Sequence, residues 1–234
     1  MHEITRASES TPDQWYGAAD INEVLRYSGI RSAEGCNESI IADAVRAVEQ
    51  VGQAALPKVI SRECSLSVNG SVCSIDDIAF VSRSLSEHLA GCDKALLFAA
   101  TLGSGVDMLI SRYSAVRMSY AVMLQGAAAA LIELYCDMEC AKLESKYGNE
   151  GQYLRPRFSP GYGDFPLEYQ HALTERLSAY KYTGIAVSSG GQMMPMKSVT
   201  AVIGISSTRR SSRGNCASGK CADCPNVGCM FRRV

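Results

Sequence analysis

The sequence has almost no net charge and no segment that marks the chain for export or for a membrane. Its 234 residues carry a formal net charge of -1, which gives no electrostatic reason to expect nucleic acid or an anionic membrane as a partner. Residues 1–6 contain no basic stretch leading into an apolar one, so no signal peptide is predicted. The longest apolar stretch, Val122 to Leu134, is interrupted by Gln125 and Glu133 and is too short to span a bilayer. We therefore expect a cytoplasmic protein that binds neither nucleic acid nor membrane.

Several familiar active-site patterns are also missing. The three histidines lie far apart without metal-ligand spacing (His2, His88 and His171). No Gly-x-Ser-x-Gly nucleophile elbow is present. Gly103 and Gly105 lack the third glycine of a dinucleotide fingerprint, so this pair predicts a turn at a helix entry. The sequence therefore does not favour a serine hydrolase, a histidine metal centre or a dinucleotide site.

Cysteine, in contrast, is abundant, with 10 in the chain. Six are scattered and are expected to be reduced, small, buried residues (Cys36, Cys64, Cys73, Cys92, Cys136 and Cys140). Cys136 and Cys140 lie one helical turn apart and are expected to face the same way. The other cysteines belong to a short tail.

The tail cysteines predict a metal site. Cys216, Cys221, Cys224 and Cys229 follow the spacing C-x4-C-x2-C-x4-C. Thiolates gathered this tightly suit an iron–sulfur cluster or zinc. The first three spacings match the plant-type ferredoxin pattern, although the fourth cysteine is closer than in that pattern. A zinc ribbon more often has two C-x2-C pairs, and a metal-free, redox-sensitive tail is the remaining alternative.

The pattern along the chain predicts an α+β fold with a mainly antiparallel, twisted sheet and flanking helices. Residues 1–19 are polar and read as an arm. Helices are expected over 21–27, from 39, from 76 to about 90, from 106, over 120–147 and over 166–180. Strands are expected in a hairpin over 64–75 that turns at Asn69-Gly70, and over 94–100, 185–187 and 198–205. Strands and helices do not alternate regularly, which disfavours a doubly wound fold. A change to Ser, Arg, Gly and Cys divides the chain into a domain over 1–205 and a tail over 206–234.

One loop has suggestive chemistry. Residues 157–163 read RFSPGYG, which places a guanidinium, a Pro-Gly turn and a phenol ring close together. The turn brings backbone amides to the surface beside a planar cation and an aromatic face. That combination suits a small ligand with a carboxylate and a positive centre, although an ordinary surface turn has the same composition.

This loop resembles the Arg-Pro-Ala-Pro-Gly-Tyr loop of the activation domain of cobalamin-dependent methionine synthase. Three further stretches agree with that family in order and approximate spacing. Glu133 lies fourteen residues before Tyr147, as an acidic residue does in the family's helix leading to its ligand loop. Residues 182–185 (YTGI) resemble its His-Thr-Gly-Met, and residues 194–200 (MPMKSVT) resemble its Trp-Pro-Gly-Ala-Ser-Val-Ser strand entry. The likeness covers roughly residues 95–205 and is closest to the small free-standing members of the family.

The resemblance implies a methionine synthase activation domain-like fold and an S-adenosylmethionine site. It implies that Arg157 pairs with the ligand carboxylate and that the backbone around Phe158 contacts the ligand. Gly161 belongs to the turn, and Tyr162 places its ring near the sulfonium. Glu133 attracts the amino group or the sulfonium; a solvated or helix-pairing glutamate is the alternative.

The resemblance also implies an accessory role in a methyltransferase reaction. Family members reactivate a corrinoid methyltransferase whose cobalamin has slipped to the cob(II) state. One electron arrives from a flavodoxin- or ferredoxin-type donor, and S-adenosylmethionine then methylates the resulting cob(I). The protein mainly positions the reactants. Whether the chain itself counts as an enzyme is left open.

Two departures from the family concern the ligand loop and the tail. Gly163-Asp164 replaces a proline and a small residue after the loop tyrosine, and the Cys-rich tail replaces a His- and Tyr-containing segment that helps to finish the ligand site. The tail suggests that an iron–sulfur cluster delivers the electron to cobalt. Other hypotheses are a non-enzymatic S-adenosylmethionine sensor, a corrinoid-protein chaperone with a zinc or iron–sulfur tail, and a zinc-tail interaction protein.

Overall fold

The computed structural model describes residues 4–6, 14–30 and 36–209. Its strands are β1 (Ile4–Arg6), β2 (Lys58–Asn69), β3 (Val72–Ile75), β4 (Ile78–Val81), β5 (Lys94–Thr101), β6 (Tyr153–Leu154), β7 (Ala186–Val187), β8 (Met193–Met194) and β9 (Ser198–Ser206). Its helices are η1 (Trp15–Ala18), α1 (Ile21–Tyr27), α2 (Glu38–Ala54), α3 (Arg83–Leu89), α4 (Ser104–Val116), α5 (Met118–Asn149), α6 (Tyr169–Arg176) and α7 (Ala179–Thr183). The predicted α+β class is confirmed.

The main sheet is antiparallel throughout, in the order β4-β3-β2-β5-β9-β6. Strand β2 lies near its centre and is long enough to pair with three others. Its first half pairs with β1, its second half pairs with β3 in the expected hairpin, and its other edge pairs with β5. Strand β5 then pairs with β9 along its full length, from Lys94↔Ile205 to Thr101↔Ser198. Strands β7 and β8 form a separate pair.

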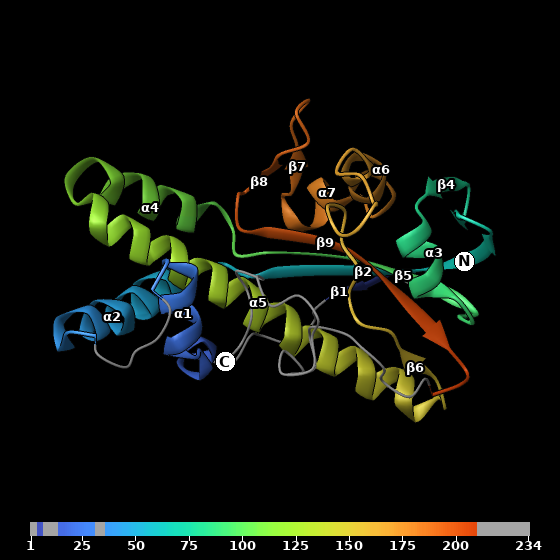
Figure 1. Cartoon of the computed structure of the whole chain (residues 1–234), viewed down its shortest axis with the longest axis horizontal. Coiled ribbons are helices and arrows are strands. Elements are labelled where there is room, and N and C mark those ends of the chain that lie inside the picture. The colour runs from blue at the N-terminus through green and yellow to red at the C-terminus, as the bar shows by residue number, and fades with distance from the viewer. Residues whose placement is uncertain (1–3, 7–13, 31–35, 210–234) are drawn as a thin grey trace.

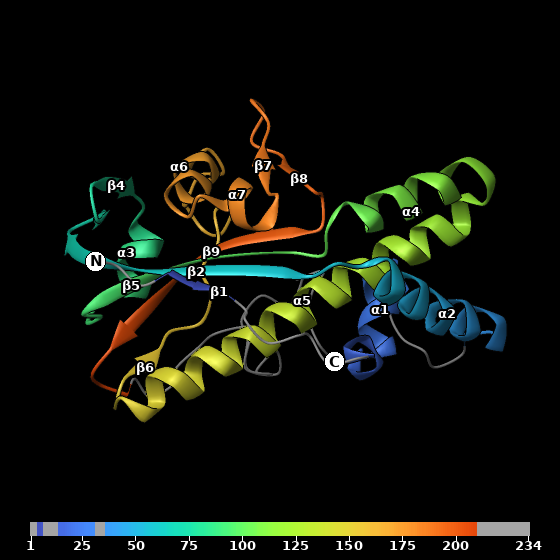
Figure 2. The same ribbon diagram turned by 180° about the vertical axis from the view of Figure 1, so that it is seen from behind.

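Helices cover both faces of the sheet (Figures 1 and 2). Alternate residues of β5 point to opposite faces, so Leu96 and Phe98 join one core while Leu97 and Ala99 join the other. The first core lies against α5, and the second lies beneath α3, α6 and α7. This explains why the β5 sequence is an uninterrupted apolar run instead of an alternating one.

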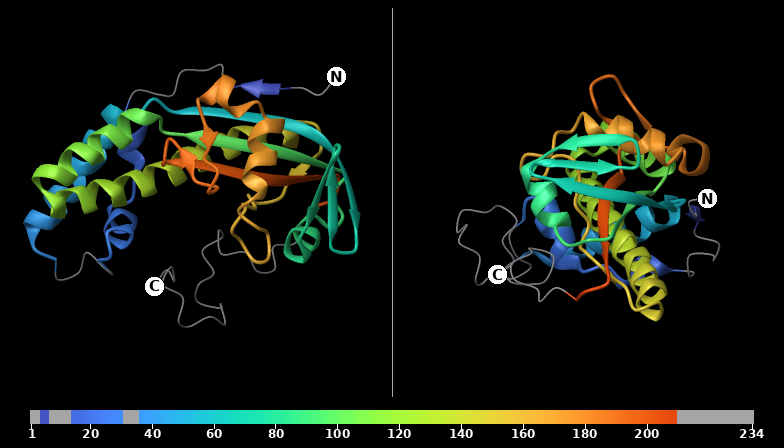
Figure 3. Two further views of the ribbon diagram at one scale, coloured as in Figure 1. Left: turned by 90° about the horizontal axis from the view of Figure 1, so that it is seen from above. Right: turned by 90° about the vertical axis from the view of Figure 1, so that its right-hand side faces the viewer.

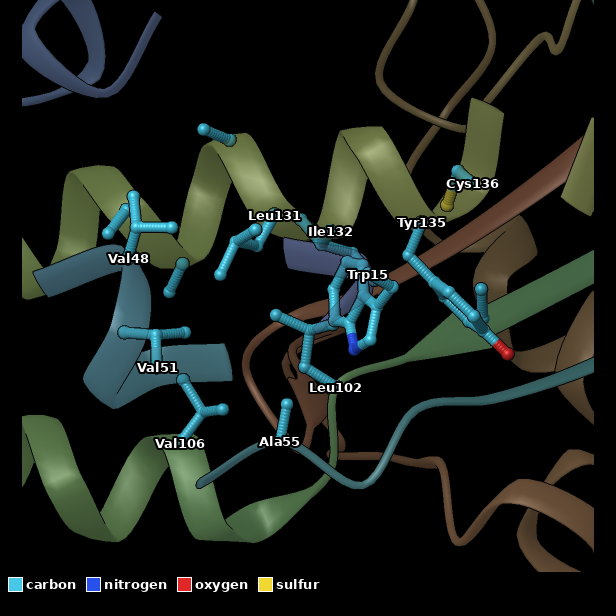
Figure 4. Close-up of a cluster of buried hydrophobic side chains, with 14 of the residues drawn as sticks. Trp15, Val48, Val51, Ala55, Leu102, Val106, Leu131, Ile132, Tyr135 and Cys136 are labelled. Carbon is cyan, nitrogen blue, oxygen red and sulfur yellow. The ribbon is translucent and has the colours of Figure 1, made fainter. Parts of the chain in front are cut away.

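A group of helices extends the fold beyond one end of the sheet. Helices α1, α2 and α4 pack against the first half of α5 there (Figure 3). Trp15 is buried among them, with its ring 5.7 Å from that of Tyr135 (Figure 4). The prediction of a polar arm over residues 1–19 is therefore wrong at its end, because Trp15 belongs to the core.

Helix α5 is the longest element. By length and composition alone it is long and apolar enough to cross a membrane. This differs from the expectation for Val122 to Leu134, which we judged too short and too polar to do so. In the described fold 61% of its apolar window is buried, so it packs as a core helix beneath the sheet. Close approach helps this packing, since a Cβ at Gly126 would lie 2.1 Å from the Oγ of Ser28, the residue that follows α1.

Two expected helices differ in the structure. The helix predicted from residue 76 begins only at Arg83, because Ile78–Val81 pairs with β3 and Ser82, not Asp76 or Asp77, accepts the capping bond from Leu85 N–H. The helix predicted over 166–180 is divided into α6 and α7 by Ser178, whose φ of 50° is incompatible with a continuing helix.

Candidate functional site

The RFSPGYG loop begins as a continuation of the sheet. After β6, the N–H of Arg155 donates to Gly204 O at 2.7 Å, and Phe158 exchanges two backbone hydrogen bonds with Val202 at 2.9 and 2.8 Å. The segment therefore follows the outer edge of β9. Neighbouring residues in such a segment point to opposite sides, which directs Arg157 toward α5 and Phe158 toward the second core.

Arg157 bridges this edge to helix α5. Its Nη2 donates to Glu133 Oε2 at 3.0 Å and to Asp137 Oδ1 at 2.6 Å. The Arg157 side chain is only 17% exposed, whereas those of Glu133 and Asp137 are 43% and 72% exposed. Both bonds use Nη2, and within the described residues none is made by Nε or Nη1, so the guanidinium keeps donors for a ligand. Burial opposes its charge, but the acidic and thiol groups of α5 outweigh burial and raise its pKa.

Two cysteines of α5 lie in the same neighbourhood. Cys136 is buried and Cys140 is half-buried, and both are free thiols. Burial raises both pKa values, that of Cys140 to about 11, although the charge of Arg157 opposes the shift. Both groups are therefore protonated and unreactive near neutral pH. The expectation that they face the same way agrees with their shared proximity to Arg157.

Phe158 anchors the loop within an aromatic cluster. Its ring centroid lies 6.2 Å from Phe165 in a stacked arrangement and 6.0 Å from Tyr162 in an edge arrangement. The His88 ring of α3 packs on Phe158 at 4.9 Å. The loop thus has a fixed inner side and leaves its outer side to Arg157 and Tyr162.

The Pro-Gly turn fixes the position of Tyr162. Gly161 has a φ of 96°, a value that disfavours side chains, and its N–H donates to Phe165 O at 2.7 Å. Tyr162, the next residue, is 56% exposed. Burial of its hydroxyl and the nearby Glu133 carboxylate raise its pKa, so the phenol is neutral near pH 7. The turn therefore presents a neutral aromatic face close to the ion pair.

The structure brings Glu133, Arg157, Phe158, Gly161 and Tyr162 into one neighbourhood. It also pairs Glu133 with Arg157 directly, whereas we expected each of them to contact a different group of the ligand. Asp137 was missed, although its place four residues after Glu133 puts both on one helix face. His88 and Asp164 were missed as partners of the loop, since no local sequence signal connects them to it.

The predicted metal ligands Cys216, Cys221, Cys224 and Cys229 lie outside the described residues. Within residues 4–6, 14–30 and 36–209, no group of three or more His, Cys, Asp or Glu side chains is arranged to hold a metal ion. The metal-binding tail therefore stays a prediction from the sequence.

The described residues form an α+β domain with an antiparallel sheet between helical layers. Among solved structures, one that matches it is the crystal structure of the MetH reactivation domain bound to AdoHcy. The TM-score is 0.64 at 16% sequence identity, over 91% of this chain and 80% of that chain. At this identity the likeness shows the fold, and it confirms the fold expected from the sequence. No protein-family model and no curated protein matches the chain.

Proposed function

We propose that the protein binds S-adenosylmethionine at the Arg157–Tyr162 loop and supports reductive methylation of a corrinoid held by a partner methyltransferase. The likeness to a reactivation domain solved with AdoHcy supports this proposal. AdoHcy is what S-adenosylmethionine becomes after losing its methyl group. The shared fold therefore supports a site for the methyl donor in this protein.

The observation that carries the proposal is the arrangement of charges around Arg157. The amino-acid end of S-adenosylmethionine carries an ammonium, a carboxylate and a sulfonium. The site offers matching groups: the exposed carboxylates of Glu133 and Asp137, the donors of Arg157 and the face of Tyr162. A guanidinium binds a carboxylate through two parallel hydrogen bonds, and an aromatic face attracts a sulfonium.

The proposed reaction requires an electron as well as a methyl donor. The partner's cob(II) takes up one electron to become cob(I), and the cobalt then attacks the methyl carbon of S-adenosylmethionine. The bond from sulfur to that carbon breaks, and neutral AdoHcy leaves. The protein contributes by holding the donor in line with the corrinoid. No described residue is assigned a catalytic proton transfer.

For the electron, we propose an iron–sulfur cluster at Cys216, Cys221, Cys224 and Cys229, supplied in turn by a flavodoxin- or ferredoxin-type donor. The support is the four-thiol spacing in the sequence. Anaerobic reconstitution with iron and sulfide should give a visible charge-transfer band and, after reduction, an EPR signal. Stoichiometric zinc without iron in the isolated protein would refute the cluster while leaving the proposed S-adenosylmethionine site intact.

Single-turnover methyl transfer tests the main proposal. The protein is mixed with a corrinoid methyltransferase that lacks its own activation domain, a low-potential chemical reductant and methyl-labelled S-adenosylmethionine. Label on the corrinoid, dependent on this protein, is the expected result. Tight binding without transfer would instead favour the sensor hypothesis. Absence of S-adenosylmethionine binding would reject both the main proposal and the sensor.

A further inference from the structure

Residues 156–164, which contain the predicted binding residues of the RFSPGYG loop, are called the ligand loop here. Helix α3 contacts this ligand loop at both ends. At the start of the loop α3 contacts Pro156 and Phe158, and at the end of the loop it contacts Gly163 and Asp164. The two contacts bracket the whole predicted binding segment. Helix α3 itself contributes none of the residues predicted to touch the ligand.

The contact at the start of α3 is made by Asp164. Its Oδ1 accepts from Ser82 Oγ at 2.7 Å and from Ser84 N–H at 2.9 Å, and its Oδ2 accepts from Arg83 N–H at 2.9 Å. These bonds hold the pKa of Asp164 well below its usual range, so the carboxylate is charged. A residue from the loop, some 80 positions away in sequence, thus caps the helix together with Ser82.

The neighbouring glycine tightens this contact. Gly163 has a φ of 56°, and a Cβ built there would lie 2.5 Å from Ser84 Oγ. Only a residue without a side chain allows the loop backbone to approach α3 this closely. Gly163 and Asp164 therefore act together to dock the end of the loop.

The contact near the end of α3 is made by His88. Its Nε2 lies 2.8 Å from Pro156 O, a distance at which the ring N–H donates to the carbonyl. The same ring packs on Phe158 at 4.9 Å between centroids. These contacts hold the residues on either side of Arg157, and so set the direction in which the Arg157 side chain points.

We propose that α3 is a clamp for the ligand loop, and that Asp164 and His88 are positioning residues for S-adenosylmethionine binding. The link to the ligand rests on the proposed function. The clamp itself rests on the contacts above and acts in the free protein. Without it, the loop would pay a larger ordering cost on binding, and affinity would fall although no ligand contact is removed.

Hydrogen exchange tests the clamp in the ligand-free protein. In Asp164→Ala, peptides spanning residues 156–165 should exchange faster than in the unaltered protein. Asp164→Asn, which keeps an oxygen acceptor, should show a smaller increase. Glu87→Ala is the matched control, because it removes the exposed Arg83–Glu87 ion pair on the same helix. Unchanged exchange in Asp164→Ala would overturn the clamp.

Calorimetric titration with S-adenosylmethionine tests the link to binding. Asp164→Ala should bind about three- to tenfold more weakly, because the released loop must then be ordered on binding. Faster exchange with unaltered affinity would overturn the positioning role. If Asp164→Ala does not fold, His88→Phe keeps an aromatic ring and removes the bond to Pro156 O, and should raise amide exchange at Arg157 and Phe158. Absence of binding in the unaltered protein would refute the proposed function, while exchange would still decide the clamp.

Discussion

Replacing Arg157 by alanine should weaken S-adenosylmethionine binding by about thirtyfold. The side chain is 17% exposed, so a ligand carboxylate that reaches it exchanges water for a largely desolvated partner. A hydrogen-bonded contact to a charged group of this kind contributes about 2 kcal/mol, which corresponds to about thirtyfold in affinity. Arg157→Lys keeps the charge but not the planar fork, so an intermediate loss of about fivefold is expected.

The effect should also depend on the sulfur charge of the ligand. Without Arg157, the carboxylates of Glu133 and Asp137 lose their shared cation and repel the ligand carboxylate, but they still attract a sulfonium. AdoHcy has no sulfonium, so Arg157→Ala should lose more affinity for AdoHcy than for S-adenosylmethionine.

Isothermal titration calorimetry with both ligands measures these differences, and circular dichroism melting checks that the variants fold. Arg46→Ala is the control, because Arg46 of α2 forms an exposed ion pair with Asp43, and neither residue belongs to the candidate site or to α3. Equal affinities in the unaltered protein and Arg157→Ala, or an equal loss in Arg46→Ala, would refute the assigned site.

Three further predictions concern the turn and the pH dependence of stability. In calorimetry, Tyr162→Phe should bind S-adenosylmethionine as tightly as the unaltered protein, whereas Tyr162→Leu should bind about threefold more weakly, since the ring face is the attractive group. Equal affinities of the Phe and Leu variants would contradict this. Gly161→Ala should lower the free energy of unfolding by about 1 to 2 kcal/mol, because φ there is 96°, and unchanged urea denaturation would contradict it. Burial alone would raise the pKa of Asp76, but hydrogen bonds from Arg176 and the backbone lower it to about 2. Asp76→Asn should therefore cost about 1 to 2 kcal/mol at pH 7, and this difference should shrink as the pH falls from about 4 toward 2. Asp77→Asn, whose exposed carboxylate contacts the same Arg176, should cost under about 0.5 kcal/mol in the same urea titration, and equal losses in the two variants would contradict the assignment.

The sequence predicted the fold where local pattern and burial agree. The hairpin at Asn69-Gly70 was predictable because turn chemistry and alternation coincide, and the β5 strand because a strand buried on both faces must be continuously apolar. The cap at Asp76 was mispredicted because an aspartate suits a left-handed turn as well as a helix start. Its φ of 51° shows that the turn between β3 and β4 prevailed.

The candidate site was predictable only in part. Residue types and their order indicated Arg157 and Tyr162, because these side chains carry the chemistry themselves, whereas Glu133 was indicated by the family resemblance. The sequence did not indicate that Asp137 shares Arg157, or that Asp164 reaches α3. The contact between Asp164 and α3 joins segments 80 or more positions apart, and only the folded sheet brings them together.

The path of the loop along β9 has a consequence for solubility. An uncovered strand edge presents free N–H and C=O groups that can pair with another chain. Here β6 and the backbone of Arg155 and Phe158 occupy that edge down to Val202. The segment that carries the candidate ligand residues thus also covers the sheet edge. Any variant that detaches it should promote strand-to-strand aggregation as well as loss of binding.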